Sequence, residues 1–244
     1  MVAKHFRESS TGPRITVGNA AVGENSDKSF IEAALEAGVK WVIPTEFTAD
    51  ISHPFAAPLP IFASKIAVIK LLKENESRIA HTFITTGGFL DWGLDNGFLG
   101  FDITSRTATL YDDGKHAFSG TTLSSIGKAV VAVIHHPELT LNRRIYIADV
   151  TATQQQALDL FEKYTGTKWT VKHTSTEDEF KRGAELFAKG DFAQGAHGYL
   201  MAVAFNGQGA CNFEGKTSNK ALGIESISLE QIIKEAAERK KAAN

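Results

Sequence analysis

The chain has 244 residues, of which 43% are hydrophobic and 22% charged, as in a soluble globular protein that buries a sizeable core. A formal net charge of -2 provides no basic field for nucleic acid or for an anionic membrane, so we expect neither as a partner. No apolar run reaches the ~18 residues of a membrane span, and no secretory signal opens the sequence. The single cysteine, Cys211, fits a reducing compartment. We therefore expect a cytoplasmic protein.

The first half of the chain alternates short strand-like runs with helical ones. The expected strands are 14–17, 39–43 and 81–86, and the expected helices are 26–37 and 60–73. This order with short links predicts an α/β fold with a Rossmann-like parallel sheet and helices on both faces. Ligands bind such sheets beyond the carboxyl ends of the strands. Those ends are the segments that begin at Gly18, Pro44 and Thr86.

The second half predicts a hairpin, several capped helices and a less regular region. Strands 108–111 and 116–118 flank a turn with Gly114, which is typical of a β-hairpin. The further expected elements are a helix over 122–136, strands over 144–148 and 169–172, and helices that begin with capping boxes at Thr153, Thr176 and Ser228. We expect the glycine-rich stretch 190–215 to form a lid or subdomain over the sheet ends.

Lys65 lies in an unusual position for a charged side chain. In the segment PIFASKIAVIKLLK it falls at the centre of the apolar stripe of the helix, together with Ile61, Val68, Ile69 and Leu72. One interpretation is a lysine whose stem covers apolar surface while its amine reaches water. The other is a catalytic amine, because apolar surroundings and a nearby helix N-terminus lower the pKa toward the range that proton transfer needs.

The ends of two expected strands carry further candidates. Thr45 either caps a turn or faces a ligand over the sheet, and Phe47 would then form a wall. Two glycines after the next strand are either a flexible exit or an opening for close backbone approach to a ligand. The residues of this second end are Gly87, Gly88, Phe89 and Trp92, of which the last two supply flat apolar surface. No histidine or cysteine spacing suggests a metal site, so we expect no metal.

Five segments in chain order carry a family resemblance. They are FIEAALEAGVKWVIPTEF, FASKIAVIKLLKE, HTFITTGGFLDWGL, YDDGKHAFSGTTLSSIGKAVVAVI and NRRIYIADVTATQQQALDLFEKYTGTKW. Together they resemble the fungal NmrA-like and isoflavone reductase-like proteins, which are atypical short-chain dehydrogenases. The likeness implies a Rossmann-like region over 1–150 that binds NAD(P), and a substrate-side α/β subdomain with a C-terminal helix over 151–244.

The resemblance also implies roles for the candidate residues. The lysine that matches Lys65 transfers a proton while hydride comes from NADPH, and it acts alone because Ile61 stands where typical short-chain dehydrogenases carry a tyrosine. The residues implied around the cofactor are Gly18, Asn19, Thr45, Phe47, Lys65, Gly87 and Gly88. Phe47, Phe89 and Trp92 would line the pocket of a small aromatic or conjugated substrate. The alternative is a non-catalytic regulator of the NmrA type, which senses a nicotinamide nucleotide.

One departure from the family pattern leads to further expectations. Family members begin with a strand, a G-x-x-G-x-x-G turn and a helix that bind the pyrophosphate, and the printed sequence has no such segment. Because Ile15 aligns with the fourth strand, we expect that roughly 70 residues are missing, at ~30 residues per βαβ unit. A misassigned start or exon, or a degenerate paralogue, would explain the missing segment. We therefore expect a truncated, incomplete sheet, weak or absent NADP binding, impaired activity and self-association through the open edge of strand 14–17.

Overall fold

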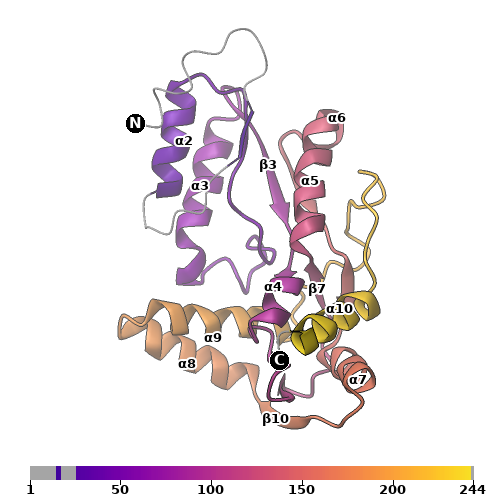
Figure 1. Cartoon of the computed structure of the whole chain (residues 1–244). Coiled ribbons are helices and arrows are strands. Elements are labelled where there is room, and N and C mark those ends of the chain that lie inside the picture. Colours follow the sequence, from indigo (N-terminus) through magenta and orange to yellow (C-terminus); the bar gives the residue numbers. More distant parts are fainter. Residues whose placement is uncertain (1–14, 18–25, 243–244) are drawn as a thin grey trace.

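A four-stranded parallel sheet forms the upper part of the computed structural model, which describes residues 15–17 and 26–242 (Figure 1). The strands follow the order β1 (Ile15–Val17), β2 (Trp41–Ile43), β3 (Ala80–Thr85) and β8 (Arg143–Tyr146). Each neighbouring pair is parallel. Within the described residues β1 pairs with β2 alone. The expected α/β class with a Rossmann-like parallel sheet is confirmed.

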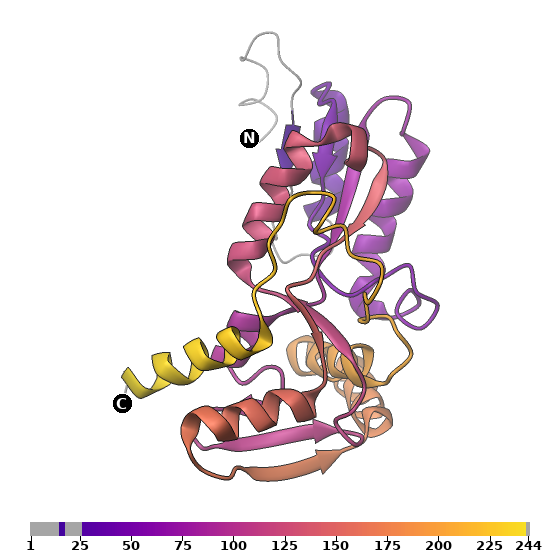
Figure 2. The ribbon, with the colours of Figure 1, turned by 90° about the vertical axis from the view of Figure 1, so that its right-hand side faces the viewer.

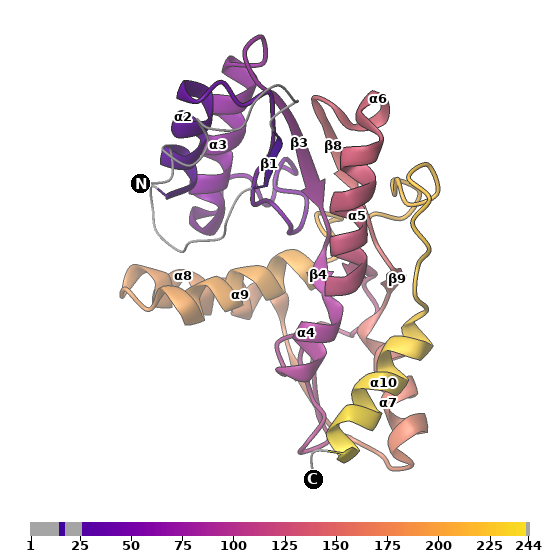
Figure 3. The ribbon, with the colours of Figure 1, turned by 45° about the horizontal axis from the view of Figure 1, so that its top comes forward.

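Helices cover both faces of this sheet. α2 (Ser26–Glu36) and α3 (Ala63–Glu74) lie on one face, and α5 (Leu123–His135) lies on the other (Figure 3). Alternate residues of β2 enter different cores: Val42 packs with the α2–α3 side, whereas Trp41 and Ile43 pack with the α5 side. Burial on both faces explains why this strand reads as a continuous apolar run.

The lower part of the molecule holds two three-stranded sheets and further helices. One sheet has the order β10 (Thr170–Thr174), β6 (Thr107–Tyr111) and β5 (Phe101–Asp102), and the other has β4 (Gly88–Phe89), β7 (Phe118–Thr121) and β9 (Val150–Ala152). The helices of this part are α4 (Leu90–Asp95), α7 (Gln154–Thr165), α8 (Thr176–Ala188), α9 (Phe192–Phe205) and α10 (Leu229–Ala242). In the upper part, α6 (Pro137–Thr140) follows α5, and a short 3-10 helix (Pro60–Phe62) precedes α3. Figure 2 shows α7 lying along β6 and β10, where Phe161 stacks near Phe101 and Trp169.

Several helix ends follow their local sequence signals. Thr153 and Gln156 form the expected capping box at the start of α7, and Gly166 ends this helix in the left-handed conformation. The Thr122 side chain caps α5 by accepting from the backbone N–H of Ser125. Among the described helices, none is both long and apolar enough to cross a bilayer.

The expected hairpin around Gly114 is wrong. A turn does form, because the N–H of Gly114 donates to the carbonyl of Tyr111 at 2.9 Å, but β6 and β7 belong to different sheets. β6 pairs with β10 and β5, and the chain after it is held by Asp112, whose carboxylate accepts from the N–H and hydroxyl of Thr176. The same contact places the start of α8 one residue earlier than expected. Ser175, and not Thr176, is the N-cap, and Thr176 is the first residue of the helix.

The stretch 190–215 is more regular than expected, since most of its first half is α9. Gly195 and Gly198 bring α9 against the backbone of α8, where a Cβ on Gly198 would come within 2.6 Å of the Glu179 carbonyl. Glycine here permits close helix packing and does not mark a loop. Figures 1 and 3 show the α8–α9 pair beyond the end of the parallel sheet where β3 terminates. Its role as a lid and the boundary at residue 150 stay predictions.

Candidate functional site

A cavity of about 490 Å³ lies beyond the carboxyl ends of β2 and β3. Its lining comes from the segments after both strands and from α4, α5 and α9. The lining residues are Phe47, Thr48, Gly87, Gly88, Phe89, Trp92, Phe98, Leu99, Leu123 and Leu200. None of these described residues is charged, and four of them are aromatic. A concave surface of this kind suits a flat, apolar small molecule.

The structure brings together most of the residues that the sequence singled out. Phe47, Gly87, Gly88, Phe89 and Trp92 line the same cavity. Their roles toward a cofactor or substrate stay predictions. Two other candidates, Gly18 and Asn19, lie outside the described residues.

Two backbone conformations shape this cavity. Gly87 has a φ of +65°, and a Cβ there would lie 2.1 Å from the carbonyl oxygen of Ser119, so glycine is required. Phe47 has a φ of 30°, which is unfavourable for a bulky residue and persists only where the surroundings impose it. One of these constraints is the bond from its N–H to the carbonyl of Ile84, at 3.0 Å.

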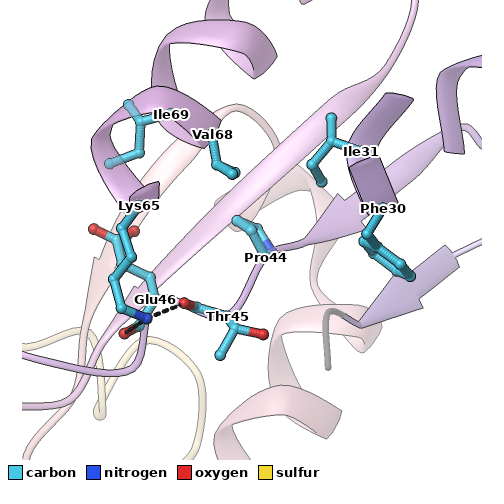
Figure 4. A pocket seen from close by; sticks show the side chains of 8 residues that line it. All are labelled: Phe30, Ile31, Pro44, Thr45, Glu46, Lys65, Val68 and Ile69. Carbon is cyan, nitrogen blue, oxygen red and sulfur yellow. Dashed lines mark hydrogen bonds between the residues drawn. The ribbon is translucent and has the colours of Figure 1, made fainter. Parts of the chain in front are cut away.

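Lys65 and Thr45 lie beside a separate hollow of about 10 Å³, between α2, α3 and the end of β2 (Figure 4). The amine of half-buried Lys65 donates to the backbone carbonyl of Thr45 and, at 3.2 Å, to that of Glu46. The hydroxyl of Thr45 is buried and has no hydrogen-bond partner among the described residues. Lys65 is therefore attached to the strand-end segment whose next residue, Phe47, lines the larger cavity.

A buried charged network, which sequence reasoning missed, lies behind this segment. The carboxylate of Glu46, 3% exposed, forms an ion pair with Arg144 of β8. The Arg144 guanidinium also donates to the hydroxyl of Thr85 at 2.8 Å, and its Nε lies 3.8 Å from a carboxylate oxygen of Asp50. The hydroxyl of Tyr146 donates to Asp50 at 2.8 Å. The one signal in the sequence was the charged Arg144 in the otherwise apolar expected strand 144–148.

Burial and hydrogen bonding shift the pKa values in this network. Burial raises the pKa of Glu46, although the positive charge of Arg144 opposes the shift. Burial alone would also raise the pKa of Asp50, but hydrogen bonds from Ser52 and Tyr146 outweigh it and lower this pKa. Burial and the bond to Asp50 raise the pKa of Tyr146 to about 12. In the part of the chain that the structure describes, no cluster of three histidine, cysteine or acidic side chains is arranged to hold a metal ion.

Comparison with known proteins places the chain in one family. A model of the NmrA-like family matches residues 14–201. The oxidoreductase aprR of Aspergillus flavus is 33% identical over 188 residues, which are 75% of this chain and 63% of that protein. The chain thus spans less than two thirds of the length of this curated relative.

Solved structures support the same conclusion at the level of the fold. A crystal structure of isoflavone reductase is similar with a TM-score of 0.75 at 18% identity, and the match covers 96% of this chain and 77% of that one. The complex of AtPrR2 with NADP+ and (+)pinoresinol gives a TM-score of 0.74 at 18% identity, over 96% of this chain and 78% of that chain. The chain belongs to the NmrA-like family.

Proposed function

We propose that this chain binds a small aromatic or conjugated molecule as part of an NADPH-dependent reductase. The cavity beyond β2 and β3 carries the proposal, because its walls are uncharged, its volume is about 490 Å³, and Phe47, Phe89 and Trp92 supply aromatic surface. Two likenesses support it: a relative that is 33% identical is an oxidoreductase, and a neighbour of the same fold was solved with NADP+ and (+)pinoresinol.

The described residues fit the nicotinamide end of the cofactor. Gly87 and Gly88 expose backbone on the cavity wall without a side chain, and Phe47 offers a flat apolar face in the same cavity. When bound, the cofactor supplies hydride. A calorimetric titration with NADPH measures the affinity of this chain, for which the sequence predicts weak or absent binding. Micromolar binding would show that prediction wrong.

Lys65 is the proton donor in this proposal. Its two carbonyl acceptors hold the amine at the end of β2, next to the segment that contributes Phe47 to the cavity. Turnover is measured as oxidation of NADPH in the presence of an aromatic acceptor, in a version of the chain extended at its N-terminus by the cofactor-binding segment that family members carry. We expect Lys65→Met to abolish turnover and to leave binding of the acceptor within about two-fold, because proton transfer is lost while the cavity wall is kept. Unchanged turnover would remove the catalytic assignment.

The hydrogen bonds of Lys65 also favour a second candidate, a non-catalytic nucleotide sensor of the NmrA type. An amine that donates to two backbone carbonyls stabilises a strand end even where no proton is transferred. In a sensor, the wild type would bind NADPH without oxidising it in the presence of any acceptor, and Lys65→Met would lower stability only. The NADPH titration and the turnover assay together separate the two functions, because a sensor binds NADPH without oxidising it.

Trp92 provides a direct readout of ligand binding. It lines the cavity and is 45% exposed, whereas Trp41 and Trp169 are 5% and 6% exposed and lie in the core. Titration with naringenin, a flavanone, should therefore quench the emission of Trp92, and Trp92→Phe should remove most of the response. Trp169→Phe is the matched control and should keep it. Absence of quenching in the wild type would contradict the proposed function.

A further inference from the structure

The ion pair of Glu46 and Arg144 connects strands that are not neighbours. Arg144 belongs to β8, which pairs with β3, yet its guanidinium reaches across β3 to Glu46 in the segment after β2. On the way it donates to the hydroxyl of Thr85 and lies 5.5 Å from the ring centre of Phe83. The pair therefore fixes the end of β2 relative to two other strands.

The segment that this pair holds contributes to the cavity and also holds Lys65. Its carbonyls at Thr45 and Glu46 accept from the Lys65 amine, and its last residue, Phe47, is a cavity wall in a strained conformation. Strain of this kind persists only where neighbouring contacts over-determine the backbone. The ion pair between Glu46 and Arg144 restrains this segment from the side of the sheet.

Stability alone gives a weak reason for such a pair. Bringing two charges out of water opposes their mutual attraction, and apolar residues of similar size often stabilise a protein as well or better. Both partners here are largely buried, since their side chains are 14% and 3% exposed. Removing one partner, however, leaves the other charge buried and uncompensated.

We infer that Arg144 is a positioning residue of the candidate site: through Glu46 it fixes the segment Thr45–Phe47, and thereby both the Phe47 wall and the carbonyls that hold Lys65. The inference rests on the proposed function, because it concerns the same cavity. Arg144 does not line the cavity and acts on it only through Glu46. The Lys65 amine and the Phe47 ring are predicted to lose their positions together when the pair is removed.

Two variants and one control test the inference. Arg144→Met leaves the Glu46 carboxyl buried without its partner, whereas the double variant Glu46→Leu with Arg144→Met removes both charges and should recover stability. Ile79→Ala is the control, because Ile79 is fully buried at the amino end of β3, away from the cavity. It should lower the thermal midpoint without moving the segment.

The first readout needs no ligand. Limited acetylation with sulfosuccinimidyl acetate, followed by mass spectrometry, measures how fast Lys65 reacts relative to the other lysines. We expect Lys65 to react several-fold faster in both Arg144 variants and at the wild-type rate in Ile79→Ala. Equal reaction rates in all four proteins would overturn the inference, and so would faster reaction in the Ile79 control, which would indicate a general loosening.

The second readout is quenching of Trp92 by naringenin, at a temperature where every variant is folded. We expect affinity to fall about ten-fold in both Arg144 variants, as a displaced wall residue loosens a site. Recovery of affinity in the stabilised double variant would overturn the inference, since stability would then explain the effect. If the wild type itself binds no naringenin, the proposed function fails, and the acetylation rates still decide whether Arg144 positions Lys65.

Discussion

Gly87→Ala tests the close backbone contact that shapes the cavity. Gly87 has a φ of +65°, and an added Cβ would lie 2.1 Å from the carbonyl oxygen of Ser119 in β7. A left-handed alanine costs about 1–2 kcal/mol. Moving the carbonyl out of contact disturbs the pairing of β4 with β7 and costs a further ~1–3 kcal/mol, in the range of overpacked cores. We therefore expect the free energy of unfolding to fall by about 2–5 kcal/mol.

Gly166→Ala is the matched control, because Gly166 has a φ of +70° and no atom within 4 Å of the position of a Cβ. It should lose only the conformational cost of about 1–2 kcal/mol. Urea unfolding followed by circular dichroism measures both variants, and the difference between them isolates the contact with Ser119. Equal losses in the two variants would refute the close approach of Gly87 to β7.

Three further predictions follow from single side chains. Thr153→Ala removes the cap of α7 and should lower the free energy of unfolding by about 1 kcal/mol in urea unfolding. Burial lowers the pKa of His81, so between its folded pKa and the ordinary value of 6.5 the unfolded chain binds more protons. Stability should therefore fall as the pH decreases through 6.5, and His81→Gln should flatten the dependence of the urea midpoint on pH. Burial raises the pKa of the Cys211 thiol to about 12, so a disulfide reagent should leave the folded protein unmodified and react once urea unfolds it.

Each of these predictions has a result that would contradict it. Gln156→Ala removes only the return bond of the capping box and should cost less than Thr153→Ala; an unchanged midpoint for Thr153→Ala would contradict the capping role. A pH dependence that His81→Gln leaves unaffected would refute the assignment to His81. Rapid modification of Cys211 in the folded protein would show that the thiol is accessible.

Local signals predicted those parts of the fold in which one or two residues decide the conformation. Thr153 with Gln156 at the start of α7, and Gly166 at its end, act through bonds within a few residues. The largely apolar run before Pro44 predicted a buried strand, and β2 is buried along its whole length. The glycine and aromatic residues at the strand ends share a cavity because the carboxyl ends of parallel strands meet at one edge of the sheet.

Contacts between distant segments were beyond the reach of sequence reasoning. The turn at Gly114 was visible, but β6 pairs instead with β10, whose Thr170 lies alongside Thr107. No residue near this turn indicates which strand will pair with β6. Glu46 and Arg144 are 98 residues apart, and neither carries a signal for the other. The amine of Lys65 binds backbone carbonyls, which every residue possesses, so its apolar position was visible and its partners were not.

The most direct test of the account is a methyl NMR spectrum of the protein during titration with naringenin. Leu99, Leu123 and Leu200 line the cavity, whereas Leu72 lies in the core between α2 and α3. Binding in the cavity predicts that the methyl resonances of the three lining leucines shift together and saturate with one affinity, while those of Leu72 stay in place. Saturable shifts confined to other methyl groups, or no shifts at all, would contradict a ligand site beyond β2 and β3.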